Sequence, residues 1–244
     1  MRRFGLIGNP LSHSFSRNYF QEKFTREHLT DCDYDLFPLA SIDELPELLA
    51  SYPDLCGLNV TVPFKERILP FLQHIDPIAQ SIGAVNCVRI ESNGALTGYN
   101  TDVIGFEQSI LPFLENNYER ALILGTGGSS KAVAWVLQRR GIEVWYASRS
   151  DKGERTLGYD QLDQYALAHF KLIINCTPLG TFPDIHTKPS LPYDGLTTSH
   201  LLYDLVYNPA ETAFLQEAKS RGAATMNGLR MLEIQAEESW SRWS

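Results

Sequence analysis

The sequence predicts a protein of the α/β class. Short apolar runs that are typical of buried strands alternate with segments of helical periodicity along most of the chain. Residues 122–130 (LILGTGGSS) pass from an apolar run through glycines into a helical pattern near Lys131, and residues 142–147 (IEVWYA) follow as a second strand. This succession of strand, loop, helix and strand is typical of a βαβ unit with parallel strands.

The composition is that of a globular protein with a substantial core. The chain has 244 residues, of which 43% are hydrophobic and 20% are charged. Its formal net charge of −8 argues against nucleic acid as a partner, so an anionic ligand must be met by locally placed donors. The sequence contains neither an apolar run as long as a membrane span nor a signal peptide, so we expect a cytoplasmic protein. Four widely spaced cysteines are expected to be reduced core residues: Cys32, Cys56, Cys87 and Cys176.

In the first hundred residues, strands are expected over 3–8, 32–37 and 55–61. A helix should end near residue 26, another should start at a capping box over 41–44, and others should begin at Lys65 and at Pro77. Residues 85–90 and 95–99 flank Ser92-Asn93-Gly94, which predicts a hairpin.

Polar side chains follow the ends of these strands. Residues 9–16 (NPLSHSFS) are dense in hydroxyls, which suits either a ligand site or local turns and caps. Lys65 is unfavourably placed for the dipole of the expected helix, which is a mild indication of function against the alternative of a solvated lysine. The hairpin could bring Asn86 and the Asn100-Thr101-Asp102 segment to one end, although Asp102 is also an ordinary helix N-cap.

In the second half, residues 125–130 predict a site for a pyrophosphate. Gly125 permits a sharp turn after the strand, Gly127 permits close approach of a ligand to the backbone, and the helix start offers N–H groups. The alternative is a glycine-rich turn that merely connects two elements, and Ser130 stands where the usual fingerprint has a third glycine.

The residues after the second strand of this unit bear on the choice of dinucleotide. An NAD site usually places an acid there, whereas Ser148, Arg149 and Ser150 combine a cation with hydroxyls, which suits the 2′-phosphate of NADP. We therefore favour NADP. A solvated Arg149 with the nearby Asp151 keeps NAD as the alternative.

The remaining strands are expected over 171–176, 201–206 and 223–226. Thr177 follows the first of these strands and faces the expected cofactor crevice, and Val206 ends the second. Residues 182–199 are expected to form an exposed excursion, and Trp240 and Trp243 to anchor a final helix to the core.

Six stretches together resemble shikimate dehydrogenases, in the order and approximate spacing of that family. They are residues 8–16 (GNPLSHSFS), 57–65 (GLNVTVPFK), 83–86 (GAVN), 98–102 (GYNTD), 125–128 (GTGG) and 231–236 (MLEIQA). The resemblance implies two α/β domains with a cleft between them. Residues 1–101, joined by the helix 228–244, would form a substrate domain with a mainly parallel sheet, and residues 102–227 a Rossmann-like NADP-binding domain.

The resemblance also implies roles for individual residues. Lys65 and Asp102 match the catalytic pair. The substrate-binding positions are Ser14, Ser16, Asn59, Thr61, Asn86, Tyr207 and Gln235. The positions expected to bind NADP are Gly125, Thr126, Gly127, Gly128, Ser129, Ser130, Ser148, Arg149, Ser150, Thr177, Val206 and Gly228.

The implied activity is the reversible NADPH-dependent reduction of 3-dehydroshikimate to shikimate, without a metal. The alternatives are a quinate/shikimate dehydrogenase that uses NAD or both cofactors, a reductase of a modified shikimate, and a non-catalytic sensor on the same fold. The expected partners are small molecules rather than nucleic acid or membrane, for a monomer or a homodimer.

Overall fold

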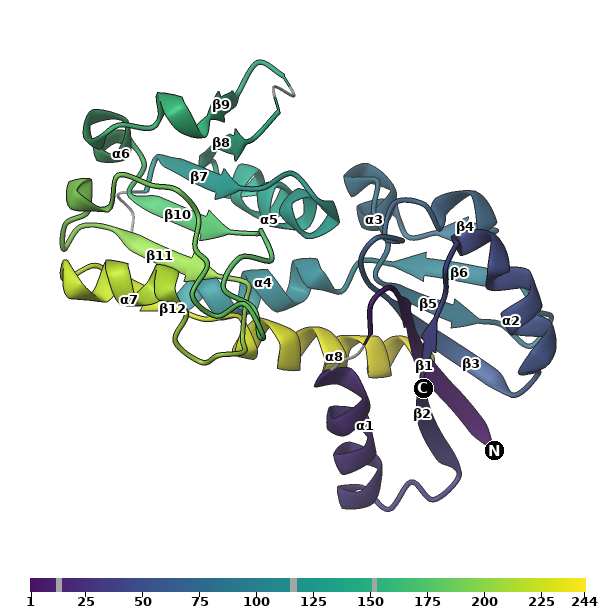
Figure 1. Ribbon diagram of the computed structural model, residues 1–244. Coiled ribbons are helices and arrows are strands. Elements are labelled where there is room, and N and C mark those ends of the chain that lie inside the picture. The colour runs from purple at the N-terminus through teal and green to yellow at the C-terminus, as the bar shows by residue number, and fades with distance from the viewer. Residues whose placement is uncertain (12–14, 115–117, 151–152) are drawn as a thin grey trace. The chain divides into compact units, whose positions relative to one another are not determined.

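The computed structural model describes residues 1–11, 15–114, 118–150 and 153–244, and it confirms the α/β class. The chain divides into two compact units. Unit 1 comprises residues 1–101 and 236–244, and unit 2 comprises residues 102–235. Each unit is built on a six-stranded sheet (Figure 1).

The sheet of unit 1 has the strand order β2-β1-β3-β5-β6-β4. β1 is parallel to both neighbours, whereas β5 is antiparallel to β3 and β6. The carboxyl ends of β1 and β3 therefore share an edge with the amino end of β5. The elements are β1 (Arg2–Gly8), α1 (Phe15–Arg26), β2 (Cys32–Pro38), α2 (Leu45–Ser51), β3 (Leu55–Val60), β4 (His74–Ile75), α3 (Pro77–Ile82), β5 (Cys87–Ile90) and β6 (Leu96–Tyr99).

Aromatic side chains build the core on one face of this sheet, where α1 and the end of α8 (Leu229–Trp243) pack. Phe4 stacks on Trp243 with ring centroids 5.1 Å apart, and Trp243 Nε1 donates to the carbonyl of Val88 at 2.9 Å. A Cβ on Gly57 would lie 2.3 Å from Trp243, so only glycine leaves room for this ring. The prediction that Trp243 anchors the last helix is confirmed. The other face is covered by α2 and α3.

The sheet of unit 2 is wholly parallel, in the order β12-β11-β10-β7-β8-β9. The chain runs outward from β7 in both directions, so the carboxyl end of β7 lies at the switch point where such sheets bind ligands. The elements are α4 (Asp102–Ile110), β7 (Arg120–Leu124), α5 (Gly128–Arg139), β8 (Glu143–Ser148), β9 (Thr156–Gly158), α6 (Gln164–His169), β10 (Leu172–Asn175), β11 (Leu201–Asp204), α7 (Ala213–Ser220) and β12 (Ala224–Met226), followed by α8.

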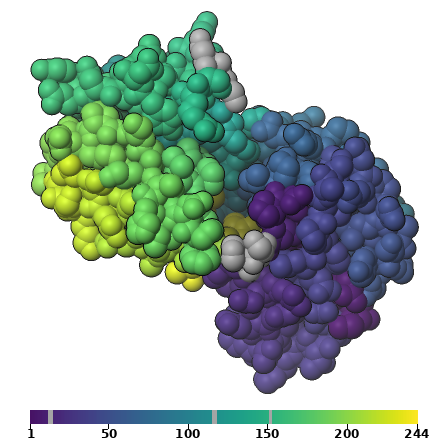
Figure 2. Space-filling model, in the orientation of Figure 1, coloured from purple at the N-terminus to yellow at the C-terminus, as the bar shows by residue number. Residues whose placement is uncertain are grey.

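Two local predictions differ from the structure. Lys65 does not begin a helix but lies in a series of turns, because its carbonyl accepts from Val85 N at 2.8 Å instead of from a residue farther along a helix. Residues 182–199 lie largely at the surface of unit 2, in light green in Figure 2, yet Tyr193 and Leu196 in this segment are buried in the core.

The last helix is divided between the two units. Its residues up to Gln235 belong to unit 2 and the rest to unit 1, whereas the family resemblance implies that the whole helix 228–244 joins the first domain. Close packing explains why the first turns of α8 stay with α4. A Cβ on Gly105 would lie 2.6 Å from the carbonyl of Met231 and 3.1 Å from Gln235 Cβ.

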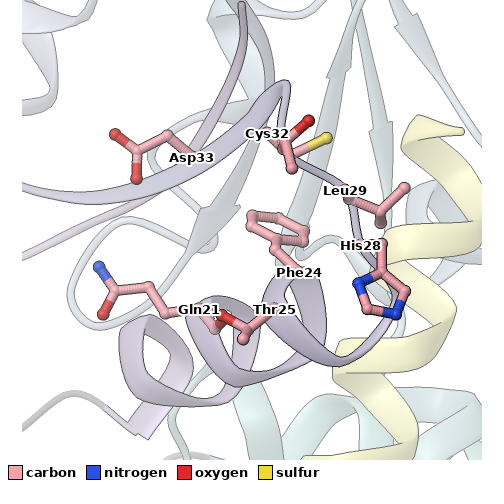
Figure 3. A pocket seen from close by; sticks show the side chains of 8 residues that line it. Gln21, Phe24, Thr25, His28, Leu29, Cys32 and Asp33 are labelled. Carbon is pink, nitrogen blue, oxygen red and sulfur yellow. The ribbon is translucent and has the colours of Figure 1, made fainter.

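A shallow hollow of about 470 Å³ lies between the end of α1 and the start of β2 (Figure 3). It is lined by Gln21, Phe24, Thr25, His28, Leu29, Thr30, Cys32 and Asp33. This is the amino edge of the parallel strands, opposite to the edge where α/β sheets bind ligands. Within the described residues, no helix has the length and apolar character needed to cross a membrane.

Candidate functional site

The carboxyl ends of β1 and β3 are joined by backbone hydrogen bonds. Thr61 N donates to the carbonyl of Ile7 at 2.9 Å, and Asn9 N donates to the carbonyl of Val62 at 3.0 Å. A Cβ on Gly8 would lie 2.4 Å from Thr61 Cγ2, so the glycine lets the two loops approach closely. Thr61 is thereby fixed beside the loop that follows β1.

The hairpin formed by β5 and β6 brings Asn86 to Thr101, as the sequence predicts. Asn86 Oδ1 accepts from Thr101 N at 2.7 Å, and Asn86 Nδ2 donates to Thr101 Oγ1 at 3.0 Å. Both side chains are buried. The residue that precedes Asp102 is therefore held by Asn86.

Asn59 is the centre of a buried polar network at the same edge. Its Oδ1 accepts from the Tyr34 hydroxyl at 2.8 Å, while its Nδ2 donates to Ser239 Oγ at 2.9 Å and to the Asn86 carbonyl at 3.4 Å. Sequence reasoning missed Tyr34 and Ser239, because a tyrosine in a strand and a serine in a helix have the same local pattern whether they pack or position a site.

Lys65 and Ser16 belong to loops and turns at this edge. The side chain of Lys65 is half-buried, and its backbone is tied to Val85, the neighbour of Asn86. Ser16 is half-buried in the first turn of α1. Ser14 lies outside the described residues.

In unit 2, the glycine loop joins β7 to α5. Gly125 has φ +95°, a left-handed conformation that favours glycine, and its N–H donates to the carbonyl of Ala147 in β8 at 3.0 Å. Gly127 is the N-cap of α5, and a Cβ there would meet no described atom within 4 Å. The first turn of α5 contains no acidic residue. This helix start, with Gly128, Ser129 and Ser130 in its first turn, suits an anion.

Arg149 follows the carboxyl end of β8, the strand next to β7. The register pairs Leu124 with Ala147, so Ser148, Arg149 and Ser150 lie on the same edge as the glycine loop. Arg149 and Ser150 are exposed. Asp151, which kept NAD as an alternative, lies outside the described residues.

On the other side of β7, Thr177 follows β10. A Cβ on Gly125 would lie 3.0 Å from Thr177 Cγ2, which places this threonine against the glycine loop. Asn175 Oδ1 accepts from the N–H and the hydroxyl of Thr177, at 3.0 and 2.6 Å. Asn175 in turn donates to Asp204 Oδ1 at 2.9 Å.

Asp204 is fully buried at the end of β11, and its carboxylate accepts hydrogen bonds from three residues. Besides Asn175, Val206 N donates to Oδ1 at 3.0 Å, and the Thr212 hydroxyl donates to Oδ2 at 2.6 Å. Burial, only partly offset by these donors, raises the pKa of this carboxyl to about 6. Sequence reasoning missed Asp204, whose only local signal is a carboxylate at the end of an apolar strand.

Val206 and Gly228 lie together beyond β11. Gly228 N donates to the Val206 carbonyl at 3.1 Å, and a Cβ on Gly228 would lie 2.1 Å from the carbonyl oxygen of Leu205. Gly228 is therefore required for this close approach of two backbone segments.

Three more of the predicted substrate-site residues belong to unit 2. Asp102 is buried as the first residue of α4, one turn before Gly105, against which Gln235 packs. Tyr207 is half-buried just after Val206. The described residues expected to contact the substrate are thus divided: Ser16, Asn59, Thr61, Lys65 and Asn86 in unit 1, and Asp102, Tyr207 and Gln235 in unit 2.

Comparison with known proteins identifies the family. The model of the shikimate dehydrogenase substrate binding domain matches residues 6–88. A shikimate dehydrogenase (NADP(+)) of Carboxydothermus hydrogenoformans is 35% identical over 98% of this chain and 90% of its own length. The chain belongs to the shikimate dehydrogenase family. This confirms the resemblance that was based on the six sequence stretches.

Solved structures agree with this family assignment. Shikimate 5-dehydrogenase from Thermus thermophilus, in complex with NADP(H) and shikimate, is 31% identical, with a TM-score of 0.86 over 100% of this chain and 94% of that one. Quinate dehydrogenase from Corynebacterium glutamicum, in complex with NAD, is 28% identical, with a TM-score of 0.87 over 100% of this chain and 93% of that one.

Proposed function

We propose that this member of the shikimate dehydrogenase family is an NADP-dependent enzyme that reversibly reduces 3-dehydroshikimate to shikimate in aromatic amino acid biosynthesis. The observation that carries the proposal is the glycine loop of unit 2, with Arg149 on the same sheet edge, in a chain that matches NADP-dependent relatives over nearly its whole length.

The residues of unit 2 fit the dinucleotide. The pyrophosphate would lie at the start of α5, where Gly127 leaves the backbone open and the first turn carries no competing acid. Arg149, with Ser148 and Ser150, would hold the 2′-phosphate, because a guanidinium forms strong charge-assisted hydrogen bonds to phosphate oxygens. Thr177, Val206 and Gly228 would line the nicotinamide half of the site.

The chemistry requires a hydride and a proton. The bound nicotinamide supplies the hydride. Lys65 delivers the proton to the developing alkoxide oxygen, and its ammonium also stabilises the negative charge there. In the reverse direction Lys65 accepts this proton. Asp102 orients the ammonium and accepts a hydrogen bond from a ring hydroxyl.

The expected substrate side chains favour a polyhydroxylated cyclic acid. Hydroxyls of Ser14, Ser16 and Tyr207 would hold the carboxylate, while Asn86 and Gln235 would meet ring hydroxyls. A site built to hydrogen-bond such hydroxyls discriminates strongly against analogues that lack them, because its polar groups would be left unpaired.

Initial rates with two substrates and two cofactors test the proposal. Shikimate and quinate are each assayed with NADP and with NAD by absorbance at 340 nm. We expect the highest kcat/KM with shikimate and NADP. Higher kcat/KM with quinate and NAD would instead identify a quinate dehydrogenase, as the Corynebacterium relative is named. Binding of shikimate without turnover in any combination would favour a ligand sensor.

The location in the cytoplasm and the state as monomer or homodimer also stay predictions. Light scattering on the purified protein measures its mass in solution and decides between monomer and dimer.

A further inference from the structure

Backbone groups determine which atoms donate and which accept in the hydrogen-bond network around Asn59. The Asn86 carbonyl can only accept, so the Asn59 amide group must face it. Asn59 Oδ1 therefore faces Tyr34, whose hydroxyl must donate.

The same network extends to the last helix. The second amide hydrogen of Asn59 goes to Ser239 Oγ, which lies 3.2 Å from Thr101 Oγ1. Thr101 is held by Asn86, whose Oδ1 must face the Thr101 N–H because a backbone N–H only donates. The chain of contacts thus runs from Tyr34 through Asn59 to Ser239, Asn86 and Thr101.

Both amide hydrogens and the oxygen of the Asn59 side chain form hydrogen bonds with other protein groups. Tyr34 is fully buried, and Asn59 is only 4% exposed. Burial raises the pKa of the Tyr34 phenol well above its usual value, which favours the protonated hydroxyl that donates to Asn59.

We propose that Tyr34 and Asn59 are positioning residues, which fix Ser239 and the Asn86–Thr101 pair at the edge formed by the carboxyl ends of β1 and β3 and so set the affinity for the cyclic acid. The inference rests on the proposed function and reassigns Asn59 from a substrate contact to a residue that acts through its neighbours. Groups that are far apart in the sequence are thereby held in one orientation before the substrate binds.

Tyr34→Phe is the sharpest test, because it removes one hydroxyl and keeps the ring that stacks on Phe20. It leaves Asn59 Oδ1 buried without its donor. We expect the KM for shikimate to rise about 5- to 50-fold, as for a buried hydrogen-bond network that loses one member, with kcat and the KM for NADP nearly unchanged. Shikimate affinity measured by calorimetry should fall by the same factor.

Tyr203→Phe is the matched control. Tyr203 is also fully buried, and its hydroxyl contacts Ser109 Oγ at 2.8 Å in unit 2, so it is not a member of the Asn59 network. Both variants should lose thermal stability, but only Tyr34→Phe should raise the KM for shikimate. If Tyr34→Phe is not recovered folded, Ser239→Ala tests the same network, and we expect a smaller rise in the same KM.

A folded Tyr34→Phe with a KM for shikimate within twofold of wild type overturns the inference, as does an equal rise in Tyr203→Phe. An unchanged KM for shikimate in the Ser239→Ala variant would also overturn the inference. The wild-type rate with shikimate separates the two proposals. Turnover by the wild type together with an unaffected variant overturns only the positioning role, whereas a wild type without turnover overturns the proposed function and this inference with it.

Discussion

At the scale of single residues, Lys65 carries the proposed proton transfer. Its backbone is fixed to Val85 in a turn rather than in a helix, so its side chain extends from a turn beyond the carboxyl end of β3 in unit 1. This placement also removes the unfavourable helix dipole that the sequence suggested.

Lys65→Ala should lower kcat about 10²- to 10⁴-fold, the usual effect of losing a general acid–base group, with a much smaller change in the KM for shikimate. Steady-state kinetics with shikimate and NADP measure both constants. Lys219→Ala is the control, since that exposed lysine pairs with Glu211 on the surface of unit 2. A kcat within a few-fold of wild type would exclude Lys65 from this role.

Arg149 is the residue through which the choice of dinucleotide can be tested. Arg149→Ala should raise the KM for NADP roughly 10- to 100-fold through loss of a charge-assisted hydrogen bond, and should affect the KM for NAD much less. Arg155→Ala removes the same charge from a nearby exposed position that pairs with Glu143. Equal effects of Arg149→Ala on both cofactors would contradict phosphate recognition.

At the scale of elements, Asp204 joins three parts of unit 2. It ties the end of β11 to Asn175 in β10 and to Thr212, the N-cap of α7. Through Asn175 it also fixes Thr177 against the glycine loop. A buried carboxylate is costly, but here each donor comes from a different segment, so the group orders the loops on one side of the expected cofactor site.

Asp204→Ala should destabilise the protein by roughly 1–3 kcal/mol, because it leaves three buried donors without their acceptor, and it should weaken NADP binding. Asp204→Asn keeps an acceptor for Asn175 and Val206, while the Thr212 hydroxyl can turn to accept. We therefore expect the Asn variant to retain NADP affinity. Calorimetric titration with NADP compares the two, and an equal loss in both would contradict the network account.

Because of the raised Asp204 pKa, the stabilities of wild type and of Asp204→Asn should depend differently on pH. The carboxyl titrates near 6 in the folded chain and at its ordinary value of 3.8 when unfolded. Between these values the folded state binds the extra proton, so wild type gains stability over Asp204→Asn as pH falls from 6 to 4, by up to about 3 kcal/mol. Urea unfolding at pH 7 and pH 5 measures this difference, and parallel pH profiles would contradict it.

At the scale of the whole molecule, two buried groups act in opposite directions on the free energy of unfolding as pH falls. Asp204 has a raised pKa and adds stability, whereas His200 has a lowered pKa and removes it. His200 is buried, with Nδ1 accepting from Thr197 N at 3.0 Å and Nε2 facing the carbonyl of Leu167 at 3.1 Å. A proton on Nδ1 would oppose the Thr197 N–H. Burial is the main cause that lowers the pKa of this imidazole below its ordinary 6.5.

Because unfolded His200 binds a proton below pH 6.5 and the folded residue does not until lower pH, the stability that it contributes is lost as pH falls through this window. His200→Gln, which can also donate and accept, should show a shallower loss of stability between pH 7.5 and 5.5. Urea unfolding at both pH values measures it. A wild-type slope no steeper than that of the variant would show that His200 does not titrate in this way.

Much of the fold could be predicted because its signals are local. Glycines and a following helical pattern mark the β7–α5 loop, and Asn93-Gly94 marks the hairpin that brings Asn86 to Thr101. The helix expected at Lys65 was wrong because a long-range backbone bond to Val85 replaces the helical one. The short strands β4 and β9 were missed, since two or three residues carry too little periodicity.

The sequence by itself determined the α/β class, the glycine loop with Arg149 after the next strand, and the family motifs, since each depends on residues close together along the chain. Only the tertiary structure decided the roles of Tyr34, Ser239 and Asp204. The partners of Asn59 lie 25 and 180 positions away, at Tyr34 and Ser239. A hydrogen bond between such distant groups leaves no periodic pattern in the sequence, because it exists only once the sheet and the last helix have packed together.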